Sequence, residues 1–223
     1  MVMDQINFHL LYLKQDKILK VINQSQTGFY LTGGTCLNRF YLEKRYSEDL
    51  DFFTSDNQLY REDIQSVIQT LKNSHILFSV IADTRDFTRI LVDTDLKLDF
   101  VNDRVYRYGH TLKTKEGYLI DNLVNILSNK ISAVLGRDEP KDVFDLYLGA
   151  RIEAFKWKDI LDAASEKAVF DLEILEYRLR SFPITLLDNL NITDPEFLQN
   201  LKQEIHIMID DITAERINSL YRH

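Results

Sequence analysis

Residues 31–53 read LTGGTCLNRFYLEKRYSEDLDFF, and this stretch decides the fold class of the chain. An apolar run ends at Leu31, and a Gly33-Gly34-Thr35 turn follows it. An amphipathic segment then leads to a block in which acidic and apolar residues alternate. This order predicts a strand, a glycine turn, a helix and a second strand.

The predicted turn and the second strand suit phosphate chemistry. Paired glycines let the backbone approach a ligand closely, and the start of a helix attracts anions. Asp49 and Asp51 are two positions apart, so on a strand they project from the same face. Two adjacent carboxylates repel each other unless a cation lies between them, and Mg²⁺ prefers such oxygen ligands. A Gly-Gly turn alone is usually only a turn, and an Asp-x-Asp alone is usually a solvated strand face.

In combination, these features resemble the first motif of the AbiEii/AbiGii-type nucleotidyltransferase toxins, a branch of the polymerase-β-like nucleotidyltransferase superfamily. The matching residues are the Gly34-Thr35 turn, the Asp49-x-Asp51 pair and the Arg45-x-Ser47 positions before that pair. Lys44 stands where this branch often has His. The resemblance implies that nucleotide is bound by Gly33, Gly34, Thr35, Arg45 and Ser47, and that metal is bound by Asp49 and Asp51.

A further candidate strand lies later in the chain, where Leu96-Lys97-Leu98-Asp99-Phe100-Val101 alternates apolar and polar residues. The alternation places Lys97 and Asp99 on one face. From the residues alone, Asp99 could simply pair with Lys97 at the end of a strand. Lys97-x-Asp99 also resembles the second motif of the same superfamily. That resemblance implies that Asp99 is the third metal ligand and activates the attacking hydroxyl.

From Tyr118 the pattern predicts helices, with Asp121 as an N-cap and with Pro140 opening a second helix. Residues 130–147 resemble the third block of the toxin family, with Lys141 where Arg is usual. Two interpretations of Lys130 and Asp145 stay open. In the first, Lys130 or Arg137 forms an ion pair with Asp145 between two helices. In the second, which the family resemblance supports, Lys130 reaches the triphosphate and Asp145 orients the lysine or helps catalysis.

Composition limits the classes of protein. The chain has 223 residues, of which 45% are hydrophobic and 28% are charged, an ordinary globular balance. We expect no membrane span and no signal peptide, and the single cysteine fits a reducing cytoplasm. The net charge of −8 argues against non-specific nucleic-acid binding. The net charge does not exclude a local basic contact to nucleic-acid phosphate, and residues 104–117 are the candidate for that contact.

These observations predict an α+β fold. Residues 1–120 are expected to form a nucleotidyltransferase core, a mixed sheet flanked by helices. Residues 121–223 are expected to form a helical region that completes the active site and an acceptor groove. The resemblance implies a Mg²⁺-dependent enzyme with two metal ions that moves a nucleoside monophosphate from an NTP to a hydroxyl. The catalytic residues implied are Asp49, Asp51, Asp99, Lys130 and Asp145, with Lys130 also contacting the nucleotide.

The resemblance also implies a biological setting: the toxin of a bacterial toxin–antitoxin or phage-defence system, with RNA, plausibly tRNA, as acceptor and an antitoxin protein as partner. Two alternatives remain. One is a nucleotidyltransferase that modifies a small molecule such as an antibiotic. The other is a scaffold member of the fold that binds NTP without transferring it.

Overall fold

A seven-stranded mixed sheet organises the amino-terminal half of the chain in the computed structural model, which describes residues 7–221. These residues divide into two compact units. The first unit comprises residues 1–35, 48–104 and 111–120, and the second comprises residues 36–47, 105–110 and 121–223, with residues 1–6, 222 and 223 outside the description.

The first unit carries every strand of the sheet, in the order β3-β4-β5-β2-β1-β7-β6. Strands β2 and β5 are parallel, as are β1 and β7, and the other neighbours are antiparallel. The strands are β1 (Tyr30–Thr32), β2 (Leu50–Ser55), β3 (Phe78–Asp83), β4 (Phe87–Val92), β5 (Leu96–Asp103), β6 (Leu112–Lys113) and β7 (Leu119–Ile120). The sheet is therefore mixed, as predicted.

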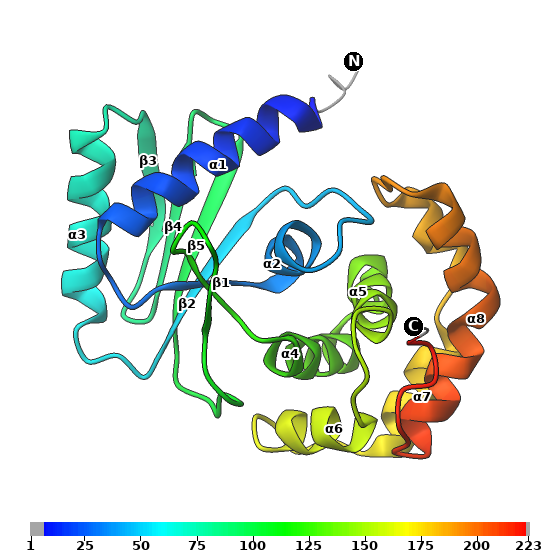
Figure 1. Cartoon of the computed structure of the whole chain (residues 1–223). Helices are drawn as coiled ribbons and strands as arrows, with labels where there is room; N and C mark the ends of the chain where they lie inside the picture. Colours follow the sequence, from blue (N-terminus) through cyan, green and yellow to red (C-terminus); the bar gives the residue numbers. More distant parts are fainter. Residues whose placement is uncertain (1–6, 222–223) are drawn as a thin grey trace. The chain divides into compact units, whose positions relative to one another are not determined.

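Helices α1 (Phe8–Gln24) and α3 (Tyr60–Asn73) cover one face of this sheet (Figure 1). The core beneath them is aromatic: Phe52 stacks on Phe100 at 5.2 Å between ring centroids, and Phe29 meets the edge of Phe100 at 5.0 Å. Because side chains alternate along a strand, Asp51 and Asp99 point to the other face of the sheet.

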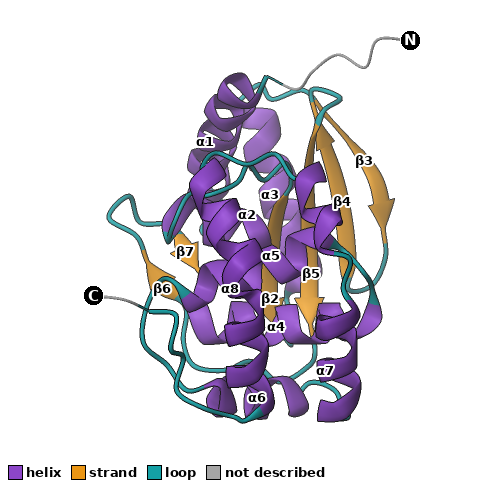
Figure 2. Ribbon diagram, turned by 90° about the vertical axis from the view of Figure 1, so that its right-hand side faces the viewer, coloured by secondary structure: helices purple, strands orange, loops and turns teal. Residues whose placement is uncertain are grey.

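The second unit is helical, and Figure 2 shows its helices in purple. Helix α2 (Gly33–Phe40) starts in the first unit and continues in this one. The remaining helices are α4 (Leu123–Gly136), α5 (Pro140–Ala150), α6 (Trp157–Ser165), α7 (Leu172–Ser181), the 3₁₀ helix η1 (Ile184–Asn189) and α8 (Pro195–Thr213). Pro140 opens α5, as the sequence predicts. The functional division at residue 120 stays a prediction.

The prediction that the helical pattern begins at Tyr118 with Asp121 as N-cap is wrong. Leu119–Ile120 is a strand, and Asn122 is the N-cap of α4, where its side chain accepts a 2.9 Å hydrogen bond from the Asn125 amide. The Asp121 carboxylate is fully buried and accepts a 2.8 Å hydrogen bond from Arg107 instead. The other Asp121 oxygen accepts a 2.7 Å hydrogen bond from the Asn125 side-chain amide, so both oxygens bind side chains.

Candidate active site

The glycine turn and Asp51 lie directly against each other in the first unit. Thr32 pairs with Asp51 across the antiparallel β1–β2 ladder, so the turn after β1 meets the start of β2. Gly33 has a φ of +71°, and a Cβ there would lie 2.7 Å from Asp51 Oδ2. Position 33 thus needs glycine for its backbone conformation and for the space that the carboxylate occupies.

A row of charged side chains continues across the same face of the sheet. Asp51 is the register partner of Asp99 on the parallel strand β5, and Asp99 is the partner of Arg89 on β4. The Arg89 guanidinium donates to both Asp99 oxygens, at 2.7 and 2.6 Å. These hydrogen bonds raise the pKa of Arg89, and the negative charges of Asp49 and Asp51 add to the effect. The three predicted metal ligands, Asp49, Asp51 and Asp99, therefore all stabilise the charged form of the Arg89 guanidinium.

Asp49 is held by its backbone on one side and by a lysine on the other. The Thr35 hydroxyl donates to the Asp49 carbonyl, and the buried Gln15 amide donates to the preceding Glu48 carbonyl at 3.2 Å. Lys97 Nζ lies 3.1 Å from Asp49 Oδ1. Thr35, predicted to contact phosphate, thus fixes the segment that carries Asp49.

The three carboxylates fit Mg²⁺ in their chemistry and in their placement on neighbouring strands, because the ion prefers oxygen ligands. Their oxygens, however, are turned to Arg89 and Lys97. Across residues 7–221, no three His, Cys, Asp or Glu side chains are grouped to hold a metal ion together. A divalent cation would have to replace these two side chains as the counter-charge.

The second unit contains a buried charged cluster built on Asp145. Arg45 forms a two-pronged contact with this carboxylate, from Nε to Oδ1 at 2.9 Å and from the guanidinium NH2 to Oδ2 at 2.8 Å. Arg45 is 4% exposed and Asp145 is fully buried. The Asn38 side-chain oxygen accepts from the Arg45 backbone amide at 3.1 Å. The arginine is therefore fixed at both its backbone and its side chain.

Lys130 extends the same cluster from α4 to α5. Its Nζ lies 2.7 Å from Asp145 Oδ2 and 2.9 Å from Asp142 Oδ1. Arg137 Nε donates to the other oxygen of Asp142 at 2.7 Å. Three cations, Arg45, Lys130 and Arg137, thus contact the two carboxylates of Asp142 and Asp145.

The cluster keeps its members ionised. Burial raises the pKa of Asp145, but the charges of Arg45 and Lys130 outweigh burial and hold it at about 2. Burial lowers the pKa of Lys130, but Asp145 and Asp142 outweigh it, so this pKa lies above its ordinary value. The geometry contains the predicted ion pair between two helices. That Lys130 reaches the triphosphate and that Asp145 orients it stay predictions.

The predicted site residues thus form two groups, each within its own unit. The first unit holds the glycine turn, Asp49, Asp51 and Asp99, and the second holds Arg45, Lys130, Asp145 and the half-buried Ser47. Sequence reasoning missed Arg89 as the partner of Asp99. The register of a β4–β5 hairpin would have identified it, because Arg89 and Asp99 are directly opposite in that ladder. It also missed Gln15 and Asn38, for which the sequence carries no signal.

None of the helices in the described part of the chain is both long and apolar enough to cross a membrane. The sheet and its helices are similar to two solved structures from Helicobacter pylori. JHP933 is 23% identical, with 91% of each chain covered and a TM-score of 0.59. A second protein, with a proposed nucleotidyltransferase activity, is 22% identical, with 95% of this chain and 98% of that chain covered and a TM-score of 0.57.

MenT4, a nucleotidyltransferase toxin from Mycobacterium tuberculosis H37Rv, is 14% identical, with 92% of this chain and 93% of that chain covered and a TM-score of 0.47. No curated protein sequence matches the chain. The mixed sheet with its glycine turn and aspartates has the nucleotidyltransferase fold.

Residues 18–220 match the family described as "Nucleotidyl transferase AbiEii toxin, Type IV TA system". The chain belongs to this AbiEii family, and it is a nucleotidyltransferase of the toxin–antitoxin type.

Proposed function

We propose that this enzyme transfers a nucleoside monophosphate from an NTP to a hydroxyl of RNA, with Mg²⁺ as cofactor. The acceptor oxygen forms a bond to the α-phosphorus, the bond from that phosphorus to the β-phosphate oxygen breaks, and pyrophosphate leaves. The acceptor proton passes to a carboxylate, for which Asp99 is the candidate. The observation that carries the proposal is the row of Asp51 and Asp99 beside the Gly33 turn.

In this proposal, the first unit holds metal and phosphate. Bound Mg²⁺ would neutralise charge on the phosphates and on the attacking and leaving oxygens. Asp49, Asp51 and Asp99 would hold it, because they are the carboxylates whose charges converge on Arg89. Gly33, Gly34 and Thr35 form the turn against Asp51 that would receive the phosphates.

The second unit would contribute positive charge to the nucleotide. The cluster brings together three cationic side chains, Arg45, Lys130 and Arg137, and clustered positive charge suits an anion. Lys130 would neutralise the triphosphate, and Asp145 would orient Lys130 through their 2.7 Å ion pair. Arg45 and Ser47 would bind nucleotide as well. Residues 1–120 would then be the catalytic core, and residues 121–223 would complete the active site and the acceptor groove.

Membership of the family supports proposals for the acceptor and the setting. We propose tRNA as the RNA class, the bacterial cytoplasm as the location, and a cognate antitoxin protein as the partner. A small-molecule acceptor, such as an antibiotic, is the alternative that the same chemistry permits. A scaffold that binds NTP without transfer is the other alternative.

The test is incubation of the purified chain with Mg²⁺, total bacterial RNA and each α-labelled NTP in turn. The matched arms replace Mg²⁺ with EDTA, or the chain with an Asp49→Asn/Asp51→Asn variant. A third variant, Asp95→Asn, removes an exposed carboxylate of the same unit that pairs with Lys14. We expect label in a tRNA-sized band from the wild type and from Asp95→Asn, and from neither of the other arms.

The outcomes separate the alternatives. Pyrophosphate release without labelled RNA, restored by small hydroxylated compounds, would move the acceptor to a small molecule. Mg²⁺-dependent NTP binding with no pyrophosphate release in any arm would identify a scaffold. Loss of folding in the Asp49→Asn/Asp51→Asn variant, measured by thermal melting, would mean that these aspartates are structural.

Arg89 gives a separate test of the metal ligands, because it occupies both Asp99 oxygens. Arg89→Gln removes that competing charge, so Mg²⁺ should bind several-fold more tightly than to the wild type, measured by calorimetry without nucleotide. Folding should change by less than about 1 kcal/mol, because the pair is partly exposed. Unchanged Mg²⁺ affinity in Arg89→Gln would argue against Asp99 as a ligand.

A further inference from the structure

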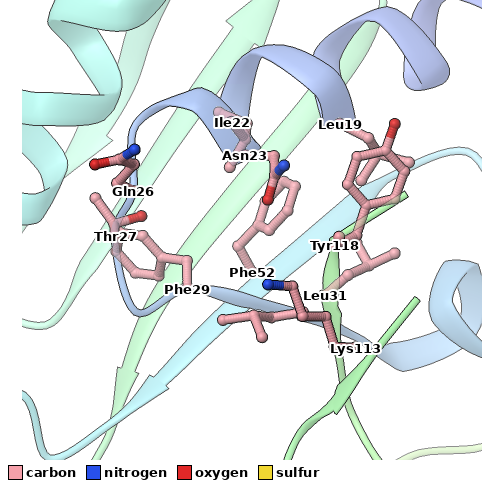
Figure 3. Close-up of a pocket in the computed structure, with 12 residues that line it drawn as sticks. Leu19, Ile22, Asn23, Gln26, Thr27, Phe29, Leu31, Phe52, Lys113 and Tyr118 are labelled. Atoms are coloured by element: carbon pink, nitrogen blue, oxygen red, sulfur yellow. The ribbon is translucent and has the colours of Figure 1, made fainter. Parts of the chain in front are cut away.

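A cavity of about 350 Å³ lies in the first unit, on the face of the sheet opposite Asp51 (Figure 3). Its floor consists of Phe29, Leu31 and Phe52, which are 5%, 1% and 3% exposed. Leu31 and Phe52 are register partners in β1 and β2. Since Phe52 directly follows Asp51, an occupant of the cavity would touch the strand that carries Asp51, from behind.

Two separate segments form the polar mouth of this cavity. Asn23 and Gln26 come from the end of α1 and the loop after it, and Lys113 comes from the β6–β7 hairpin. A Cβ built on Gly117, at the tip of that hairpin, would lie 3.7 Å from both Asn23 Nδ2 and Lys113 Cε. These side chains therefore converge, and Figure 3 shows the amine of Lys113 turned toward the interior of the cavity.

The charge of the cavity differs from that of the chain as a whole. The chain has 35 Asp and Glu residues against 27 Lys and Arg residues, yet the cavity is lined by one lysine and by no carboxylate. Within residues 7–221, Lys113 has no carboxylate partner within 4.0 Å. The side-chain amides of Asn23 and Gln26 also make no hydrogen bond to that part of the chain. The polar groups at the mouth are therefore available to a ligand.

We propose that this cavity binds a small amphiphilic anion: a flat apolar ring system that carries one carboxylate or phosphate group. The apolar floor would take the ring, because transfer of apolar surface out of water is favourable. Lys113 would take the anion as a point charge, and the two amides would hydrogen-bond to it. The volume is within the range of about 300–1,000 Å³ that is typical of small-molecule sites. This site does not depend on the transfer reaction.

The probe is 8-anilino-1-naphthalenesulfonate, an aromatic anion that fluoresces in apolar surroundings, titrated into the full chain. We expect one saturable site per chain. Lys113→Gln should weaken binding by about fivefold or more, as expected for loss of one charged contact. Lys115→Gln is the matched control, because it removes a neighbouring exposed lysine that does not line the cavity. Unsaturable binding, or equal weakening by both substitutions, would overturn the proposal.

A neutral probe separates the charge from the cavity. N-phenyl-1-naphthylamine lacks the sulfonate, so it should bind equally well to the wild type and to Lys113→Gln. Asn23→Trp places a large ring at the mouth and should abolish binding of both dyes, with an unchanged melting temperature as proof of folding. A folded Asn23→Trp variant that binds both dyes as the wild type does would place them elsewhere.

Competition identifies the anionic group. Naphthalene-1-acetate and 1-naphthyl phosphate carry the same ring with a carboxylate or a phosphate. We expect at least one of them to displace the sulfonate dye from the wild type. The stronger competitor indicates whether the natural ligand carries a carboxylate or a phosphate. Failure of both to displace the dye would refute the site as described.

Discussion

Replacing Asp145 with Asn should destabilise the protein strongly, because it removes a negative charge from a buried cluster. Asp145 is fully buried, and its partners Arg45 and Lys130 are 4% and 8% exposed. Removing one partner of a buried ion pair costs about 3–5 kcal/mol, because a buried charge is left uncompensated. Asn keeps one acceptor oxygen, and Asp142 still faces Lys130 at 2.9 Å, so the lower end, about 3 kcal/mol, is expected.

The pH dependence gives a second measure of the same interaction. The pKa of Asp145 falls from 3.8 to about 2 on folding, so its contribution is complete above pH 4 and is lost as the pH falls through about 2. Lowering this pKa from 3.8 to about 2 corresponds to about 2–3 kcal/mol of stability. The difference in stability between the wild type and Asp145→Asn should therefore shrink as the pH falls from 4 toward 2.

The assay is urea unfolding of both proteins at pH 7 and at several pH values below 5. The control is Asp210→Asn, which breaks a pair with Arg180 that is about half exposed and should cost less than about 1 kcal/mol. A loss below about 1 kcal/mol for Asp145→Asn at pH 7 would refute the reasoning. So would a difference from the wild type that stays constant or grows at low pH.

Two glycine substitutions test the packing around the two groups of site residues. Gly33→Ala forces an alanine into a φ of +71° and places its Cβ 2.7 Å from Asp51 Oδ2, so it should cost about 1–3 kcal/mol and abolish pyrophosphate release. Its control, Gly136→Ala, meets nothing within 4 Å on a helix and should stabilise by about 0.5–1 kcal/mol in the same urea assay. Gly149→Ala would place a Cβ directly against Leu127 Cδ2, so overpacking should lower the free energy of unfolding by about 1–3 kcal/mol. An unchanged urea midpoint would contradict the α4–α5 packing.

Local patterns predicted the parts of the fold that are determined by neighbours in the sequence. The alternation in residues 96–101 predicts the strand β5, and Pro140 predicts the start of α5. The apolar run, the glycine turn and the amphipathic segment after it predict β1 followed by α2. In each case, the physical cause lies within a few residues of the feature that it produces.

Long-range contacts account for what the sequence could not predict. Strand β7 has only two residues, too few for a periodic pattern, and it is defined by its pairing with β1 on one side and β6 on the other. Asn122 caps α4, while the Asp121 carboxylate contacts Arg107, which is 14 residues away in the sequence. Both are polar residues of similar capping preference, and only the folded contacts distinguish them.

The separation of Arg45 and Asp145 by 100 residues has a consequence during synthesis. At about 5–20 residues per second, a ribosome needs about 5–20 s to add the stretch between them. A chain that stops before residue 145 can assemble neither this pair nor the helix that follows Pro140. In a cell that makes a toxin of this kind, translation products that end before residue 145 would therefore lack the charged cluster of the finished enzyme.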